Sequence, residues 1–161
     1  MRRAMVRPGR DKLSGSVEID ETMLGGADKG GKRGRGAGRK SIVVIAIEIH
    51  EPRGFGRVRM QRIPDASGQS LIPFVKNSVL SGSTVLTDCW RGYNGLKNFD
   101  YTHNRVKLSE SGDPAHVTMP GVHRISALLK RWLLGTHQGS ASAKHLDYYL
   151  DEYTFRFNRR K

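Results

Sequence analysis

The sequence contains a single cysteine, Cys89, among its 161 residues. One cysteine cannot form an internal disulfide or provide the ligands of a zinc ribbon, and it fits a reducing cytosol. Long apolar runs are also missing. Residues 1–10 are basic and lack the apolar core of a signal peptide, and no stretch approaches the roughly 20 apolar residues of a membrane span. We therefore expect a cytoplasmic protein with no membrane partner.

Acidic residues are scarce, with 15 Asp and Glu against 28 Lys and Arg, so the formal net charge is +13. This excess is larger than solubility requires and suits a polyanionic partner, of which nucleic acid is the first candidate. At this length we expect one domain whose core needs no disulfide or metal for stability. We assign residues 1–14 to a basic N-terminal arm and residues 15–161 to the domain.

The segment 25–40 has seven glycines and six basic residues but a single acidic residue, Asp28. It cannot build a core, and its flexibility and charge suit contacts with phosphate backbones. Without aromatic side chains it should position nucleic acid rather than read a base sequence. A solvated hairpin loop with no partner is the alternative. The candidate DNA contacts in this segment are Lys29, Lys32, Arg33, Arg35, Arg39 and Lys40.

The apolar pattern predicts an α/β fold with five strands and three longer helices. Strands are expected at about 15–22, 41–49, 55–63, 84–87 and 100–106, and helices at about 68–80, 121–134 and 142–158, with a link at 135–139. A short helix could open near 93–96. The first three strands follow one another and should form an antiparallel meander. The helix at 68–80 is a crossover that makes the strand at 84–87 parallel.

Two aspartates are placed where such a sheet presents its chemistry. Glu18 and Asp20 alternate with apolar residues and share one face of the first strand. Asp88 comes directly after the strand at 84–87, at the carboxyl end that open α/β sheets use for binding. An isolated aspartate at a strand end more often caps a turn, so Asp20 alone would be weak evidence.

The helix expected from residue 121 adds a third group. His123 follows Asp88 after 34 intervening residues, and Lys130 comes seven residues later. Positions seven apart share a helix face, so His123 and Lys130 should face the carboxylates together. A lone histidine on a helix is usually structural. Combined with two aspartates, however, such a group can complete a site for one or two divalent cations that promote phosphodiester cleavage.

Several blocks of residues resemble those of DDE-type insertion-sequence transposases, specifically the ISXO-like bacterial branch. The resemblance covers nearly the whole chain from about residue 15. The matching blocks are 17–22 (VEIDET) with Gly25 and Gly26, 86–93 (LTDCWRGY), 129–137 (LKRWLLGTH), 144–146 (KHL) and 149–160 (YLDEYTFRFNRR).

The resemblance implies a ribonuclease-H-like catalytic domain: a mixed five-stranded sheet, with the three-stranded meander plus parallel strands, flanked by helices. It implies that Asp20 and Asp88 are the first two metal-binding acids and that His123 stands in the place of the third. Lys130 matches a basic residue that such enzymes use to hold DNA. The implied catalytic residues are thus Asp20, Asp88, His123 and Lys130, and the first three would bind Mg²⁺ or Mn²⁺.

The implied partners are DNA, as element ends and as target, and further copies of the chain in a homo-oligomer during transposition. Besides the residues of the segment 25–40, the DNA contacts would include Arg91, Lys130 and Arg131. The implied activity is metal-dependent DNA cleavage followed by strand transfer.

The sequence departs from the family at two points. The third metal position holds His123 in place of glutamate, and imidazole suits Mn²⁺ better than Mg²⁺. The upstream zinc-ribbon or helix-turn-helix part is missing, so we expect a truncated copy. An inactive remnant that binds nucleic acid is therefore an alternative. A ribosomal-type RNA-binding protein is another, but it leaves the acids unexplained. If His123 is not a ligand, the third group lies in the loop at 110–113 or is absent.

Overall fold

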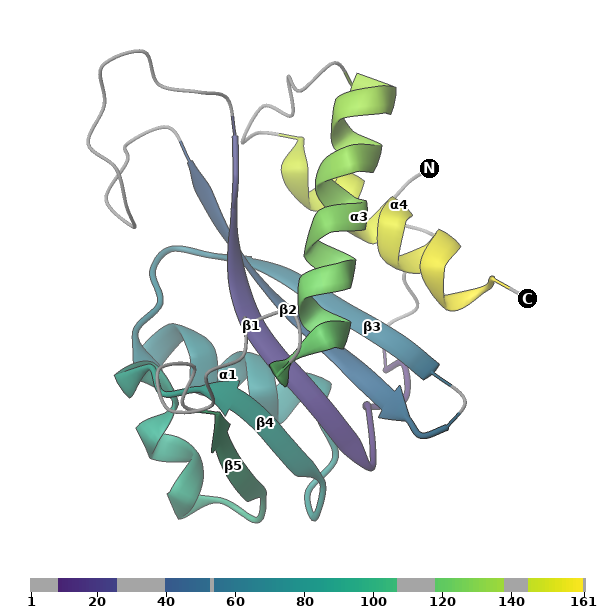
Figure 1. Ribbon diagram of the computed structural model, residues 1–161. Helices are drawn as coiled ribbons and strands as arrows, with labels where there is room; N and C mark the ends of the chain where they lie inside the picture. Colours follow the sequence, from purple (N-terminus) through teal and green to yellow (C-terminus); the bar gives the residue numbers. More distant parts are fainter. Residues whose placement is uncertain (1–8, 26–39, 53, 107–117, 138–144, 161) are drawn as a thin grey trace.

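A computed structural model of the chain describes residues 9–25, 40–52, 54–106, 118–137 and 145–160 (Figure 1). Within these ranges the chain forms five strands, three α-helices and one 3₁₀ helix. The strands are β1 (Ser16–Leu24), β2 (Ser41–His50), β3 (Gly54–Ile63), β4 (Thr84–Asp88) and β5 (Thr102–Val106). The helices are α1 (Gly68–Ser78), the 3₁₀ helix η2 (Arg91–Asn98), α3 (Pro120–His137) and α4 (Leu146–Asn158).

The strands form one mixed sheet in the order β3-β2-β1-β4-β5. β1, β2 and β3 pair as an antiparallel meander, whereas β4 is parallel to β1 and β5 is parallel to β4. The expected mixed five-stranded sheet is therefore confirmed, and its strand order is that of a ribonuclease-H-like domain. Because β1, β3, β4 and β5 run in one direction, their carboxyl ends meet at the same edge of the sheet.

Both faces of the sheet are covered, which explains the long apolar run of β2. Val44 and Ala46 belong to the core on one face, and Val43, Ile45 and Ile47 belong to the core on the other. A strand at the centre of a two-sided sheet must be apolar on both sides. Figure 1 shows α1 and η2 on one face and α3 and α4 on the other.

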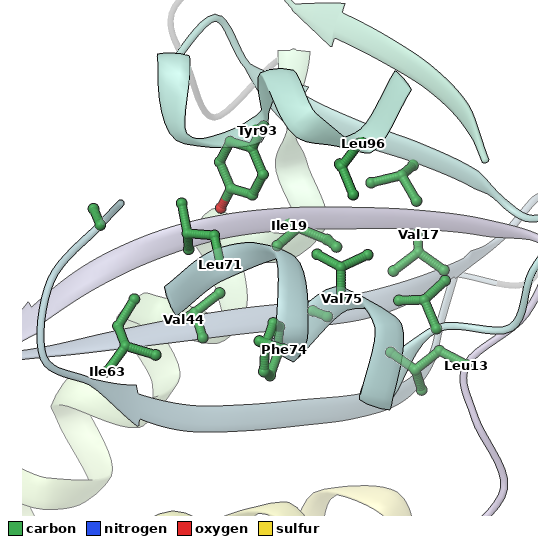
Figure 2. Packing of buried hydrophobic residues seen from close by; sticks show 14 residues of the cluster. Leu13, Val17, Ile19, Val44, Ile63, Leu71, Phe74, Val75, Tyr93 and Leu96 are labelled. Carbon is green, nitrogen blue, oxygen red and sulfur yellow. The ribbon is translucent and has the colours of Figure 1, made fainter. Parts of the chain in front are cut away.

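The core under α1 connects β1 to the 3₁₀ helix that follows β4. Leu71, Phe74 and Val75 of α1 pack toward Ile19 of β1, and Tyr93 of η2 closes the same cluster (Figure 2). All five side chains are almost completely buried. Burial of such side chains stabilises the fold by roughly 1.5–3 kcal/mol each, which fixes η2 against the strand that carries Asp20.

The end of the expected N-terminal arm is packed into the domain. Leu13 is fully buried and forms a parallel bridge with Val79 after α1. Its N–H donates to the Ser78 carbonyl at 2.8 Å, and its own carbonyl accepts from Leu80 N–H at 2.8 Å. A boundary at residue 14 thus leaves a core residue in the arm, and the packed part of the chain begins earlier.

The helical third of the chain differs from expectation at one junction. A link was expected at 135–139, but α3 continues through Gly135 to His137. Glycine costs a helix about 1 kcal/mol, which does not end a helix whose preceding turns are packed. The expected cap Ser142 lies outside the described residues. No helix within the described ranges is long and apolar enough to cross a membrane.

Candidate active site

Asp20 and Asp88 lie at the same level on neighbouring parallel strands. The ladder between β1 and β4 ends with Glu18 opposite Leu86. Continuing this register by two residues beyond the last paired residues places Asp20 opposite Asp88, and adjacent strands are about 4.8 Å apart. Side chains two residues apart point to the same face, so both aspartates are on the α3 face with Glu18. Both are partly exposed; Asp88 ends β4, whereas Asp20 lies in the middle of β1.

A buried tyrosine lies beside these carboxylates. The Tyr93 hydroxyl donates to Glu21 Oε1 at 2.6 Å, and the ring is fully buried. Burial raises the pKa of the Tyr93 phenol well above its usual value, and the carboxylates of Glu21, Asp20 and Asp88 raise it further. The phenol therefore stays protonated and donates a hydrogen bond at the base of the site. The sequence signal that could have identified Tyr93 is its position in the block 86–93, one of those that resemble the transposase family.

The turn after β4 is closed by its own hydrogen bonds. Asp88 Oδ1 accepts from the Trp90 backbone N–H at 3.0 Å, and the Trp90 indole N–H donates to the Ala66 carbonyl at 2.6 Å. A Cβ at Gly92 would lie 2.6 Å from that carbonyl oxygen, so glycine permits the close approach. These contacts join the turn to the loop before α1 and orient the Asp88 carboxylate.

Helix α3 is attached to β1 on both sides of Asp20. Glu18 Oε2 accepts from the Val122 backbone N–H at 2.9 Å, and Ser126 Oγ donates to Thr22 Oγ1 at 2.8 Å. A carboxylate at a helix N-terminus satisfies free N–H groups and complements the helix dipole. Burial raises the pKa of Glu18, although the helix N–H groups and the nearby His123 oppose that shift. The strand pattern alone predicts no role for Glu18 beyond its place on this face.

His123 is partly buried and lies near enough to Glu18 to oppose the rise in the pKa of that carboxyl. Within the part of the chain that the structure describes, no group of three or more His, Cys, Asp or Glu side chains could hold a metal ion. Two carboxylates can nevertheless bind Mg²⁺ when water and substrate phosphates complete its shell. The pair of Asp20 and Asp88 fits that requirement. The loop at 110–113, where a third ligand was sought, lies outside the described residues.

Basic side chains are exposed around this edge of the sheet. Lys130 and Arg131 are exposed on α3, Arg91 is exposed at the start of η2, and Lys40 is exposed before β2. These four remain candidate DNA contacts. The other candidates, Lys29, Lys32, Arg33, Arg35 and Arg39, lie outside the described residues.

Comparisons with known proteins agree with this arrangement. The sequence pattern of one family, the ISXO2-like transposase domain, matches residues 12–158. A protein of Haemophilus influenzae (strain ATCC 51907 / DSM 11121 / KW20 / Rd), described as an uncharacterized transposase-like protein, is 27% identical over 96 residues. That alignment covers 60% of this chain and 76% of the other protein.

Proposed function

The chain belongs to the family of ISXO2-like transposase domains, and on this premise we propose that it cleaves DNA and joins the cut strand to target DNA during movement of an insertion sequence. The observation that supports this proposal is the parallel pairing of β1 with β4, whose register, continued by two residues, would bring Asp20 level with Asp88 on one face of the sheet. Two carboxylates on neighbouring parallel strands, one of them at the carboxyl end of its strand, are a suitable site for metal-dependent phosphodiester chemistry.

In this proposal Asp20 and Asp88 bind Mg²⁺ or Mn²⁺. His123 would contribute the third ligand only after it moves toward the two aspartates, because the three side chains do not form a metal-binding group in the described part of the chain. The bound cation would promote attack by water on the phosphodiester and then by the released 3′-hydroxyl on target DNA. Tyr93 lies beside the pair. Its hydrogen bond to Glu21 keeps a neutral donor next to the carboxylates of Glu21, Asp20 and Asp88.

The basic residues at the same edge would bind the DNA backbone. In this proposal Lys130 is the basic side chain of the catalytic site and holds DNA there. Arg91, Arg131 and Lys40 would extend the contact with the phosphates. Cutting and joining require two element ends to be brought together, so we propose a homo-oligomer on DNA. Work on chromosomal DNA in a bacterial cell also implies a cytoplasmic protein.

Nicking of a supercoiled plasmid in Mn²⁺ tests the proposed site. We expect Asp20→Asn and Asp88→Asn each to abolish nicking. DNA affinity should stay equal or increase, because a charge that repels phosphate is removed. Asp100→Asn is the matched control, since Asp100 is exposed and lies before β5, and it should nick like the wild type. Nicking that survives either active-site substitution would exclude this site.

A DNA-binding protein without cleavage activity is the second candidate, because a histidine stands at the third metal position. It predicts wild-type protein that binds DNA but nicks no plasmid in Mg²⁺ or Mn²⁺. The same nicking assay decides between the two candidates, because metal-dependent nicking by the wild type is expected from the first alone.

A further inference from the structure

A large aromatic side chain is exposed two residues after Asp88. Trp90 has 37% of its surface accessible, although its indole N–H is paired with a backbone carbonyl. Leu80, Phe99 and Leu134 are also exposed, but none of them belongs to the turn after β4, and Leu134 lies one helical turn from Lys130 on α3. Trp90 is therefore the exposed aromatic side chain that a substrate at Asp88 would meet.

The Trp90 ring is oriented before any ligand binds. Its indole N–H bonds to the Ala66 carbonyl at 2.6 Å, and its backbone N–H bonds to Asp88 Oδ1 at 3.0 Å. A Cβ at Gly92 would also lie 2.9 Å from the indole nitrogen, so the chain turns tightly against the ring. A ring fixed in this way loses little conformational entropy when a ligand packs on it.

Positive charge lies on the same turn. Arg91 is exposed directly after Trp90. Arg105, near the carboxyl end of β5, donates to the Cys89 carbonyl at 3.3 Å and is also exposed. An aromatic surface with two guanidinium groups beside it suits a ligand that has both a flat apolar face and phosphates. Nucleic acid has both, whereas a protein segment rich in acidic residues supplies negative charge without a flat apolar face.

We propose that Trp90 stacks on an unpaired nucleobase of the DNA strand whose phosphate lies at Asp88, with Arg91 and Arg105 on the flanking phosphates. This rests on the proposed function and names its substrate as a strand that is unpaired at the cleavage point. Bases within a duplex are stacked on their neighbours, so a protein ring can take a base face when the base is unstacked. Stacking of one base on an aromatic side chain contributes about 1–3 kcal/mol.

Oligonucleotide binding in EDTA tests this inference separately from cleavage. The probes are a single-stranded oligonucleotide with 2-aminopurine and the same sequence as a blunt duplex. We use the Trp132→Phe background, because Trp132 packs against Tyr149 and Tyr153 and would contribute a second tryptophan signal. We expect the single strand to quench Trp90 fluorescence and 2-aminopurine to be quenched in return. Trp90→Ala should weaken single-strand binding about fivefold to a hundredfold, the range equivalent to the stacking energy.

Trp90→Phe separates stacking from folding, because it keeps an aromatic ring and loses the bond to Ala66. It should bind the single strand within a few-fold of wild type, whereas duplex affinity should be nearly equal in all three proteins. Absence of mutual quenching in the Trp132→Phe protein that keeps Trp90 overturns the inference even if Trp90→Ala fails to fold. Equal loss for duplex and single strand, or no loss, also overturns it and favours a protein partner. Because binding and quenching are measured in EDTA, where no metal-dependent cleavage occurs, failure of the cleavage proposal would be seen separately in the nicking assay.

Discussion

The buried carboxylate of Glu18 accepts a hydrogen bond from the Val122 backbone N–H at 2.9 Å, which joins β1 to the first turn of α3. Glu18 is 3% exposed, and Asp20 lies two residues further along the same face. His123 directly follows Val122, and Asp20 lies two residues after Glu18. The bond between Glu18 and Val122 therefore sets the position of His123 relative to Asp20. Glu18 acts as a positioning residue for the proposed site.

The close approach of α3 to the sheet depends on Gly121. A Cβ there would lie 2.6 Å from Ile49 Cδ1 and 3.0 Å from Glu18 Oε2. Gly121→Ala should therefore destabilise the protein by about 1–3 kcal/mol, the usual cost of forcing an extra methyl into a packed core. Urea unfolding measures the change in the free energy of unfolding.

Gly135 on the same helix provides the matched control. A Cβ at Gly135 would meet nothing within 4 Å. Gly135→Ala should leave stability unchanged or raise it by up to about 1 kcal/mol, because alanine is the better helix former. Equal effects of the two substitutions would show that the contact between α3 and β1 is loose.

The strands could be predicted because their patterns are local. The unbroken apolar run of β2 reports burial on both faces, and Asp88 follows a β-branched run that ends at a glycine-containing turn. The end of α3 was not predictable in this way. Gly135 resembles a stop signal, but the packing of Leu129 and Leu133 on the sheet carries the helix past it.

The sequence predicts the two aspartates of the candidate site but not the residues that surround them. Asp20 and Asp88 are marked by strand alternation and spacing. The bond from Glu18 to α3 joins residues 104 positions apart, and the bond from Tyr93 to Glu21 joins residues 72 apart. No periodicity in one sequence encodes such long-range pairs, so the supporting residues appear with the tertiary structure.

Glu48 is a second buried carboxylate, and its environment predicts how stability depends on pH. Its oxygens accept from the N–H of Ser14 at 3.0 Å and of Arg57 at 2.8 Å, and from the Arg57 guanidinium. Burial alone would raise the pKa of Glu48, but the hydrogen bonds and charge of Arg57 outweigh it, so the pKa lies below the ordinary 4.5. Such a carboxyl contributes stability above pH 4.5, and the contribution is lost as pH falls through the folded-state pKa.

Glu48→Gln should therefore lower the free energy of unfolding at pH 7 by roughly 1–3 kcal/mol, because the charged acceptor is replaced by a neutral one. The difference between mutant and wild type should shrink as pH falls below 4.5. Thermal melting from pH 7 to pH 3 measures this, and Glu51→Gln, in the exposed turn before β3, is the control. A difference that is constant across this range would mean that Glu48 does not titrate with folding.

His123 can be tested as a metal ligand through its pH dependence. A histidine binds metal as neutral imidazole, so Mn²⁺ affinity should fall as histidine becomes protonated. His123→Glu should flatten this dependence above pH 5.5 or so and shift preference toward Mg²⁺, since hard cations prefer carboxylate oxygens. Mn²⁺-dependent stabilisation in thermal melts measures affinity. If His123→Ala leaves the Mn²⁺ titration unchanged at every pH, His123 is not a ligand.

The outer edge of β3 is closed by the side chain of Asn158 from the end of α4. Asn158 Oδ1 accepts from the Val58 N–H at 2.7 Å, and Asn158 Nδ2 donates to the Val58 carbonyl at 3.1 Å. The amide thus replaces the backbone of a neighbouring strand at one residue. Arg160 adds guanidinium contacts to the carbonyls of Phe55 and Gly56. An edge strand with free N–H and C=O groups is a template for pairing with another chain.

Asn158→Leu should therefore have two effects, because leucine fills a similar volume but can form neither hydrogen bond to Val58. The free energy of unfolding should fall by roughly 1–3 kcal/mol, since the Val58 N–H loses its partner and the Val58 carbonyl keeps only the Arg59 guanidinium at 2.9 Å. Self-association should rise with protein concentration, because the opened edge of β3 can pair with a second copy. Urea unfolding and sedimentation velocity measure the two effects, and Arg159→Ala is the control, since Arg159 is exposed and stacks on the Phe155 ring. Lower stability without self-association would show that Arg160 alone protects the edge, whereas an unchanged unfolding free energy would show that water replaces the Asn158 amide at Val58.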